Sequence, residues 1–284
     1  MSTMNARIGV VVLVLLASSQ ARAAGKPFRW DTKHARFQAT EYVLTGTTGP
    51  FAMFQYTFLH PPAQPRWIGG ILFDDAARNL FRLHSPDALR AAWTGADATG
   101  VTLAVLVAGV DSIIVPIARG SFEVAWETTM MNAESFALGS LVAFTLTDTV
   151  GRARPVYQDC TSGKTTVGCD GLTASFPSGH TTEAFIVAGL SCAHHLYGRL
   201  YGSRAADAFA CARDLTLASF EGMLRVAGDR HWISDVIIGS AIGFAFGFGL
   251  PTLLHYRGRS RGFSVAPTPL VGANATGLAL GGRF

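Results

Sequence analysis

The residues with the clearest chemical potential lie in three short groups, and the middle group stands directly before an apolar stretch. It reads Phe-Pro-Ser-Gly-His over residues 176–180. Ser178 and the Gly179 amide would lie at the amino-terminal end of a helix, where oriented N–H groups and the helix dipole favour an anion. His180 then offers a proton at the mouth of that site. The simpler alternative is an ordinary serine N-cap followed by an incidental histidine.

The last group consists of Arg225, His231 and Asp235, in the spacing Arg-x5-His-x3-Asp. His231 and Asp235 are four residues apart at an expected helix start, so they are predicted to share one face and to hydrogen-bond. A carboxylate on one imidazole nitrogen fixes the tautomer and leaves the other nitrogen available as a nucleophile. A chance surface pair of histidine and aspartate is the alternative.

The first group, residues 151–155, places Arg152 and Arg154 on a turn at the expected end of a helix. Two guanidinium groups suit a bidentate grip on phosphate-like oxygens, and Pro155 stiffens the exit from the turn. Taken alone, two arginines at the carboxyl end of a helix are more often solvated charges that interact with the helix dipole.

Taken together and in this order, the three groups resemble the signature of the type 2 phosphatidic acid phosphatase superfamily. That superfamily includes bacterial class A acid phosphatases and vanadium haloperoxidases. Its pattern is Lys-x6-Arg-Pro, then Pro-Ser-Gly-His, then Ser-Arg-x5-His-x3-Asp. The resemblance covers roughly residues 67–256 and is strongest to bacterial periplasmic acid phosphatases and lipid phosphate phosphatases. The matching residues are Arg154-Pro155, Pro177 to His180, and Arg225, His231 and Asp235.

The resemblance implies a metal-independent phosphatase that hydrolyses phosphate monoesters or lipid (di)phosphates through a phosphohistidine intermediate. In that mechanism His231 attacks phosphorus, Asp235 orients His231, and His180 protonates the departing alkoxide. No metal or other cofactor is expected, because arginines and a helix terminus supply the positive field. The residues expected to hold the phosphate oxygens are Arg154, Arg225, Ser178 and Gly179, with Arg152 as a further candidate.

Two positions depart from the family pattern. The position seven residues before Arg154 is a lysine in the family and holds Thr147 here, and Leu224 replaces the serine of the last group. The missing lysine removes one phosphate-binding charge, which Arg152 or Lys164 is a candidate to replace. The change to leucine removes at most one hydrogen bond.

Two other functions stay open from the sequence. One is a haloperoxidase that holds vanadate at His231, although the intact His-x3-Asp spacing favours hydrolysis. The other is a non-catalytic phosphate-binding relative. The expected partner is a phosphorylated small molecule or lipid, and the leaving group stays open between a lipid phosphate, a polyprenyl diphosphate and a soluble phosphomonoester. Nucleic acid is not expected, because the lysines and arginines form no cluster.

The first 23 residues have the three-part pattern of a secretory signal peptide, with an apolar run over residues 8–17 and Ala-Arg-Ala over residues 21–23. The protein is therefore expected in the periplasm or at the periplasmic face of the envelope. The four cysteines form no Cys-x-x-Cys pair and favour disulfides, Cys160 with Cys169 and Cys192 with Cys211.

The chain has 284 residues, of which 49% are hydrophobic and 15% charged, which excludes a disordered protein. Residues 101–117 and 236–254 are apolar enough to be candidate membrane spans. The hairpin that would hold Cys192 and Cys211 is more polar, and a disulfide there favours an oxidising compartment. A soluble or peripheral enzyme is therefore predicted, with an integral membrane enzyme as the alternative.

The expected architecture is an all-α bundle of about six core helices, followed by a tail able to form a short β-hairpin. His194, His195 and His255 lie outside the three groups and are interpreted as structural. The expected segments are a signal peptide over residues 1–23, a lead-in with the first helix over 24–66, a phosphatase domain over 67–256 and a Gly/Pro-rich tail over 257–284.

Overall fold

The computed structural model describes residues 28–257, 264–272 and 275–283, and its helices, joined by loops, lie between residues 39 and 256. The expected signal peptide lies outside the described residues. The long helices are α2 (Ala39–Phe58), α4 (Pro86–Ala104), α6 (Phe122–Val150), α8 (Gly179–Ala193), α9 (Arg204–Ala227) and α10 (Ile233–Phe244). The short ones are α3 (Asp74–Phe81), α5 (Val115–Ala118) and α7 (Tyr157–Thr161). The π-helical turns are η1 (Val105–Ile114), η2 (His194–Gly198), η3 (Ala245–Gly249) and η4 (Thr252–Tyr256).

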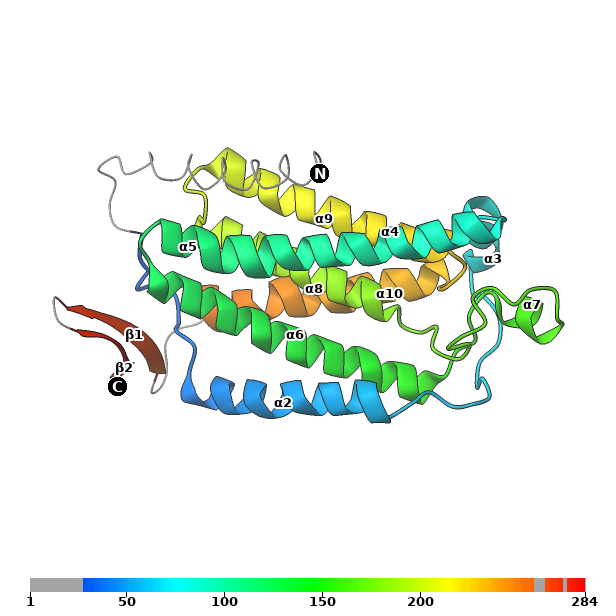
Figure 1. The fold of residues 1–284 in the computed structure, drawn as a ribbon, viewed down its shortest axis with the longest axis horizontal. Helices are drawn as coiled ribbons and strands as arrows, with labels where there is room; N and C mark the ends of the chain where they lie inside the picture. The colour runs from blue at the N-terminus through cyan, green and yellow to red at the C-terminus, as the bar shows by residue number, and fades with distance from the viewer. Residues whose placement is uncertain (1–27, 258–263, 273–274, 284) are drawn as a thin grey trace, which may run out of the picture.

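The all-α prediction is confirmed for the body of the protein, and the tail forms the expected hairpin. Strands β1 (Ser264–Gly272) and β2 (Ala275–Arg283) pair antiparallel, with Ser264 opposite Arg283. Figure 1 shows the long helices side by side, with α3 and α7 at one end of the bundle and the hairpin beyond the other end. The hairpin therefore lies away from α3 and α7.

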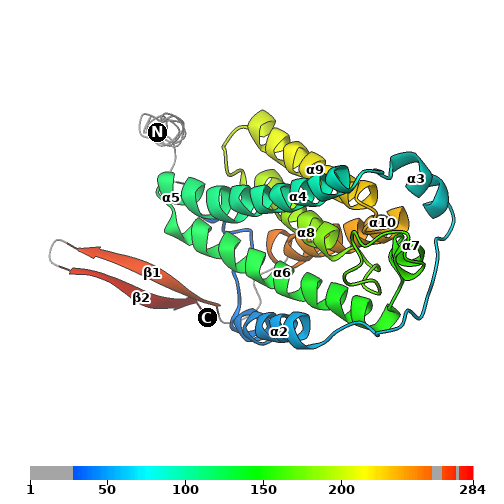
Figure 2. The same cartoon turned by 45° about the vertical axis from the view of Figure 1, so that its right-hand side comes forward.

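Helix α8 is the centre of the bundle and contacts α4, α6, α9 and α10, an arrangement that Figure 2 displays from a second direction. Small and branched apolar side chains pack in these contacts. Leu103, Ala184, Ala188 and Ala218, for example, form one buried cluster. Alanines on facing helices allow close interhelical distances. Apolar packing therefore stabilises α8 on several sides.

Three glycines determine how closely α10 and η3 approach α8. Gly239, Gly243 and Gly247 are four residues apart and share one face, and a Cβ atom on any of them would overlap a backbone carbonyl oxygen of α8 or of the residue before it. Only glycine fits at such a close backbone contact. The amino-terminal ends of α8 and α10 consequently lie next to each other.

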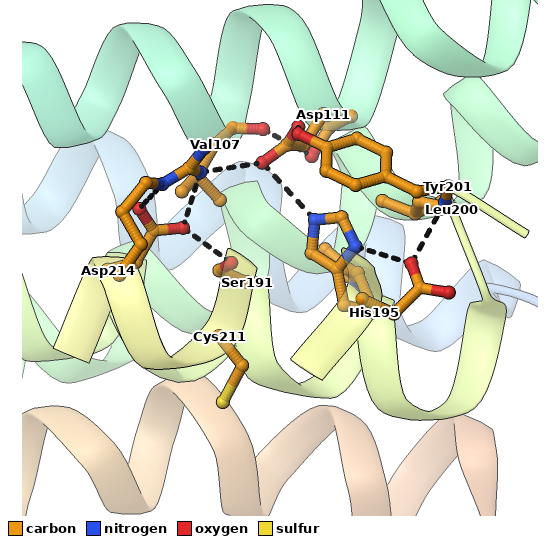
Figure 3. Close-up of polar contacts among 12 residues, drawn as sticks. Val107, Asp111, Ser191, His195, Leu200, Tyr201, Cys211 and Asp214 are labelled. Atoms are coloured by element: carbon orange, nitrogen blue, oxygen red, sulfur yellow. Dashed lines mark hydrogen bonds and ion pairs between the residues drawn. The ribbon is translucent and has the colours of Figure 1, made fainter. Parts of the chain in front are cut away.

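Both predicted disulfides are present: Cys160 pairs with Cys169, and Cys192 pairs with Cys211. The second one joins α8 to α9 beside a buried polar network, shown in Figure 3, in which His195 lies between two carboxylates. The Nδ1 atom of His195 is 2.8 Å from Asp207, and the Nε2 atom of His195 is 3.3 Å from Asp111. This network fixes the turn between α8 and α9 at the hairpin end of the bundle.

Two helical stretches of the described chain are long and apolar enough to cross a membrane, Pro86–Ala118 and Ile233–Tyr256. They contain the two segments that the sequence analysis identified as candidate spans. Neither α8 nor α9 meets the same criterion within the described residues. Many large apolar side chains are also exposed, on α2 (Val43, Met53 and Phe58), on α4 and the turn after it (Val101 and Val105) and on α10 (Ile237).

Candidate active site

The loop after α6 and the amino-terminal ends of α8 and α10 surround one cavity of about 540 Å³. Its polar wall includes Arg154 from the loop, Gly179 and His180 from α8, and His231, which directly precedes the N-cap of α10. These four residues come from all three groups of the sequence analysis. The structure therefore brings the three groups together around one space.

His231 is buried and has one hydrogen-bond partner, the backbone carbonyl of Ser175, which its Nδ1 atom contacts at 2.7 Å. A carbonyl oxygen only accepts hydrogen bonds, so Nδ1 carries the proton and Nε2 of the neutral ring keeps a lone pair. Burial first, and the charge of Arg154 second, lower the pKa of His231 well below its ordinary value. The ring is therefore kept as the neutral, nucleophilic form.

The direct hydrogen bond that the spacing predicted between His231 and Asp235 is absent, so that prediction is wrong. Helix α10 begins at Ile233, which leaves His231 outside the helix, where the four-residue rule for a shared face does not apply. Asp235 instead accepts hydrogen bonds from the Ser175 hydroxyl at 2.7 Å and from the Trp232 amide at 3.0 Å. Its carboxylate holds the residue whose carbonyl positions His231.

Arg152 does not face the cavity, which corrects its assignment as a phosphate-binding residue. Its side chain is completely buried and forms ion pairs with Asp74 at 2.7 Å and Asp235 at 2.5 Å. The guanidinium group also lies 3.9 Å from the centre of the Trp67 ring. Two carboxylates neutralise this cation, so it joins α3 to the start of α10 and cannot replace the missing family lysine.

Arg154 is the arginine of the first group that lines the cavity. Its Nε atom donates to the Gly171 carbonyl at 2.7 Å, and no other hydrogen bond of its guanidinium group is formed with the described residues. Burial first, and the charge of Arg230 second, lower its pKa. A guanidinium group on the cavity wall with donors to spare favours an anion in the cavity.

Arg230 and its partner Asp170 are functional candidates that the sequence analysis missed. Asp170 accepts two hydrogen bonds from the Arg230 guanidinium group, at 2.7 and 2.6 Å. The motif pattern gives no sign of them, because Arg230 stands within the variable x5 spacer. Its position directly before His231 was the available signal.

Arg225 has its side chain almost fully buried and is not among the residues that line the cavity. It donates to Glu221 and to Asp97, each at 2.6 Å. Its charge nevertheless acts on the site, because it contributes to lowering the pKa of both His180 and His231. Arg225 is therefore close to the cavity but already paired.

His180 lies on the cavity wall with its side chain 59% exposed, and its Nε2 atom is 3.9 Å from Asp97. Desolvation within the site, followed by the charge of Arg225, lowers its pKa to about 4, against the opposing effect of Asp97. Without a bound anion the ring is thus neutral at pH 7. A phosphate bound in the cavity beside Arg154 would raise the pKa of His180 again.

Ser178 and Gly179 differ in what they offer the cavity. The Ser178 hydroxyl is buried and lies 2.8 Å from the Thr181 hydroxyl, which points it away from the cavity lining. Gly179 lines the cavity, and a Cβ atom there would meet nothing within 4 Å. The open side of Gly179 lets an anion approach the unpaired N–H groups at the start of α8.

Thr147, which stands in the position of the family lysine, does line the cavity. Its hydroxyl donates to the Ala143 carbonyl of its own helix at 3.0 Å. Glu183 also lines the cavity, one turn after His180, and burial raises its pKa to about 7. The sequence analysis missed Glu183, although a spacing of three residues from His180 on a helix places both on one face.

Thr147→Lys is expected to lower the KM for a phosphate ester about tenfold, since it adds one charge-assisted hydrogen bond to phosphate in the cavity. The measurement is the initial rate of phosphate release against substrate concentration. Thr149→Lys is the matched control, because Thr149 lies at the same end of α6, is exposed and does not line the cavity. Equal KM values for Thr147→Lys and the wild type would show that phosphate does not reach this wall.

The Cys160–Cys169 disulfide closes the loop that leads directly to Asp170 and Gly171, the partners of Arg230 and Arg154. Replacing both cysteines with serine is expected to raise KM about tenfold with a smaller effect on Tm, because the loop gains freedom. The double serine variant of Cys192 and Cys211 is the control. It is expected to lower Tm and leave KM unchanged, and the reverse pattern would contradict this role of the loop.

The helical fold and the cavity, with two histidines, a cavity-facing arginine and a helix amino terminus around one space, define a class of proteins whose site suits a phosphate-like anion. Residues 129–259 match the model of the PAP2 superfamily, and this range contains all three groups. That segment is similar to the PAP2 superfamily, the type 2 phosphatidic acid phosphatase superfamily that the motifs resemble.

One curated relative is the lipid A 1-phosphatase of Porphyromonas gingivalis, which is 44% identical to this chain over 79 residues. The aligned part covers 28% of this chain and 16% of that protein, so the chain matches about a sixth of the relative's length. No solved structure matches the chain.

Proposed function

We propose that this protein is a phosphatase that removes phosphate from a phosphorylated lipid through a phosphohistidine intermediate. One observation supports the lipid substrate: the cavity that contains His231 and His180 continues between α2 and α6 along an apolar surface. The residues on that surface include Ala52, Met53, Tyr56 and Leu59 from α2 and the residue after it, and Ala133, Phe136, Ala137 and Phe144 from α6.

The extent of this surface suits an alkyl chain. The cavity lining on α6 runs from Ala133 to Asp148, and this span corresponds to about 22 Å at 1.5 Å per helical residue. A phosphate next to His231 therefore leaves room for a long apolar group between α2 and α6. The relative's printed name, which specifies a lipid as substrate, supports the same substrate class.

The proposed reaction has two transfers of the phosphoryl group. The lone pair on His231 Nε2 attacks phosphorus, the bond from phosphorus to the ester oxygen breaks, and protonated His180 gives its proton to that oxygen. Water then attacks the phosphohistidine, His180 takes a proton from this water, and inorganic phosphate leaves with His231 restored. Arg154 and the amides at the start of α8 stabilise the oxygens as charge develops on them.

Metal independence is part of the proposal, because groups of this chain supply the positive field. Arg154 faces the cavity, while Arg225 and Arg230 add charge behind it. Vanadate is expected to inhibit by occupying the phosphate position beside His231. Full activity after a chelator treatment, and inhibition by vanadate, are the expected results.

We also place the enzyme at a membrane surface of the cell envelope, after export by its amino-terminal signal peptide. The stretches Pro86–Ala118 and Ile233–Tyr256, together with the exposed apolar side chains of α2, support contact with lipid. The two disulfides support an oxidising compartment such as the periplasm. An enzyme in this position receives its substrate from the same membrane.

Phe136→Gln tests the apolar surface, since Phe136 lines the cavity and is 41% exposed, so the fold tolerates the change. It is expected to raise the KM for a long-chain alkyl phosphate about tenfold, through lost apolar contact, and to leave a short-chain phosphate unchanged. The assay is phosphate release from both substrates in detergent micelles. Phe220→Gln is the matched control, an exposed phenylalanine of α9 outside the cavity.

An equal change in KM for both chain lengths would contradict the apolar surface as the lipid site. Absence of phosphate release from every ester would favour the non-catalytic alternative. Bromination by the vanadate-loaded protein would favour the haloperoxidase.

A further inference from the structure

A second cluster of chemically capable side chains lies outside the active site, where α2, α6 and η4 meet. Glu41 comes from the first turn of α2, Glu134 from the middle of α6 and His255 from η4. One donor atom from each residue lies within 4.8 Å of the other two. His255 Nε2 is 3.5 Å from Glu134 and 3.9 Å from Glu41, both longer than a hydrogen bond.

The buried donors of this cluster have no hydrogen-bond partner among the described residues. Both ring nitrogens of His255 and the Oε1 atom of Glu134 are buried in this way, and the two side chains are each 1% exposed. His194 provides the contrast, because its nitrogens contact the Tyr256 hydroxyl at 2.7 Å and Asn132 at 2.8 Å. Buried polar atoms are normally paired, so the three residues lack a common partner.

Among the carboxylates around the cluster, those of Glu41 and Glu134 remain available to bind a common partner. Glu127 lies nearby, but it accepts the Phe37 amide at 2.8 Å and faces Arg36 at 3.7 Å. The second oxygen of Glu41 accepts the Gln38 amide and caps α2, which fixes the carboxylate in place. Two carboxylates and one imidazole form a ligand set that matches a divalent cation.

We propose that Glu41, Glu134 and His255 bind one divalent transition-metal cation of the Zn²⁺ type. Zinc bonds to nitrogen and oxygen of about 2.0–2.1 Å place tetrahedral ligands about 3.3 Å apart, and the separations of 3.5 and 3.9 Å are close to this value. A mixed set of one nitrogen and two oxygens suits zinc, manganese or iron(II) better than calcium or magnesium.

Two further hydroxyl groups support the assignment. The Oγ1 atoms of Thr45 and Thr252 are buried without a hydrogen-bond partner among the described residues, and these threonines stand four residues after Glu41 and three residues before His255. Three protein ligands leave a fourth position for water, and hydroxyl groups of this kind hold such a water in place.

The metal would join α2, α6 and η4 at a distance from His231 and His180, where phosphoryl transfer is proposed. Glu134 is 16 residues before the end of α6, which corresponds to about 24 Å along that helix. The ion therefore takes no part in phosphoryl transfer. It would instead fix α2, which forms one wall of the cavity, against α6 and the last helix.

The test uses the whole protein without a histidine tag, stripped with a chelator and dialysed into buffer free of phosphate. Calorimetric titration with Zn²⁺ is expected to give one equivalent per chain, and Tm is expected to rise. Addition of Co²⁺ is expected to produce saturable visible absorption bands. Glu134→Gln and His255→Gln are each expected to weaken binding at least tenfold.

Two control variants distinguish this site from others. Glu127→Gln should retain the metal, because glutamine still accepts the Phe37 amide, and His180→Ala should retain it because it alters only the active site. If the His255 variant does not fold, the wild-type titration decides alone. Absence of a Tm shift and of saturable Co²⁺ bands in the wild type would overturn the proposal, as would binding that only His180→Ala weakens.

Discussion

Replacing His231 with alanine is expected to lower kcat by at least about 10⁴-fold, the scale of loss for a covalent nucleophile. The Ser175 carbonyl fixes the proton on Nδ1, so Nε2 is the nucleophilic atom of the ring. His180 is not prepared in this way, because it lies in a partly exposed position beside Asp97. Phosphate release from an alkyl phosphate is the measurement.

His84→Ala is the control for this variant, since His84 is exposed and does not line the cavity. It is expected to retain wild-type kcat. Near-wild-type turnover in a folded His231→Ala protein would remove the phosphohistidine mechanism. Circular dichroism and Tm establish that the variant is folded before its kcat is compared.

His180→Ala is expected to separate substrates by their leaving groups. An alkoxide requires a proton as it departs, so kcat for an alkyl phosphate should fall by about 10² to 10⁴-fold. p-Nitrophenolate leaves without a proton, so the same variant should lose less than about tenfold with p-nitrophenyl phosphate. His60→Ala is the matched control, a histidine that lines the same cavity on the α2 side.

The pH dependence follows from the same residue. The pKa of His180 is lowered to about 4, so the protonated acid becomes scarcer as the pH rises above that value. For an alkyl phosphate, kcat/KM should therefore fall with rising pH, relative to the His180→Ala variant. Protonation of His231 is not expected to lower kcat/KM near pH 7, because the pKa of His231 is also lowered. If His60→Ala reproduced the leaving-group pattern, or both pH profiles were parallel, the acid would not be His180.

The sequence was sufficient to predict the family, the all-α fold, both disulfides and four residues of the cavity wall. These features depend on local patterns: apolar periodicity, cysteine spacing and three short motifs. The cavity-lining residues were Arg154, Gly179, His180 and His231.

The partners of those residues could not be predicted, because they come from distant segments without a motif. Asp74 is 78 residues from Arg152, and the Ser175 carbonyl is 56 residues from His231. The role of Asp235 was predicted from helical spacing, which failed because the helix begins two residues after His231. How the helices pack determines which residues far apart in the sequence become hydrogen-bond or ion-pair partners.

Helix starts were also incompletely predicted. The helix expected over residues 101–117 begins at Pro86, where Ser85 accepts the Ala88 amide and Pro86 occupies the first turn. Both residues are common at helix starts, so the signal was available. Helix α2 also continues through Pro50, a residue type that usually ends or kinks a helix.

The close contact of Gly239, Gly243 and Gly247 with α8 also restricts how the cavity can open. A sliding movement of α10 along α8 would press the neighbouring side chains against α8 carbonyl groups, so we expect the two helices to move together. The separation of His180 from His231 then stays constant while substrate enters. Widening that admits a lipid chain is therefore expected on the α2 side, in the carboxyl-terminal half of α2 that lines the cavity and lies away from Glu41. The α2 side of the bundle would therefore admit the substrate, while α8 and α10 would keep His180 and His231 aligned.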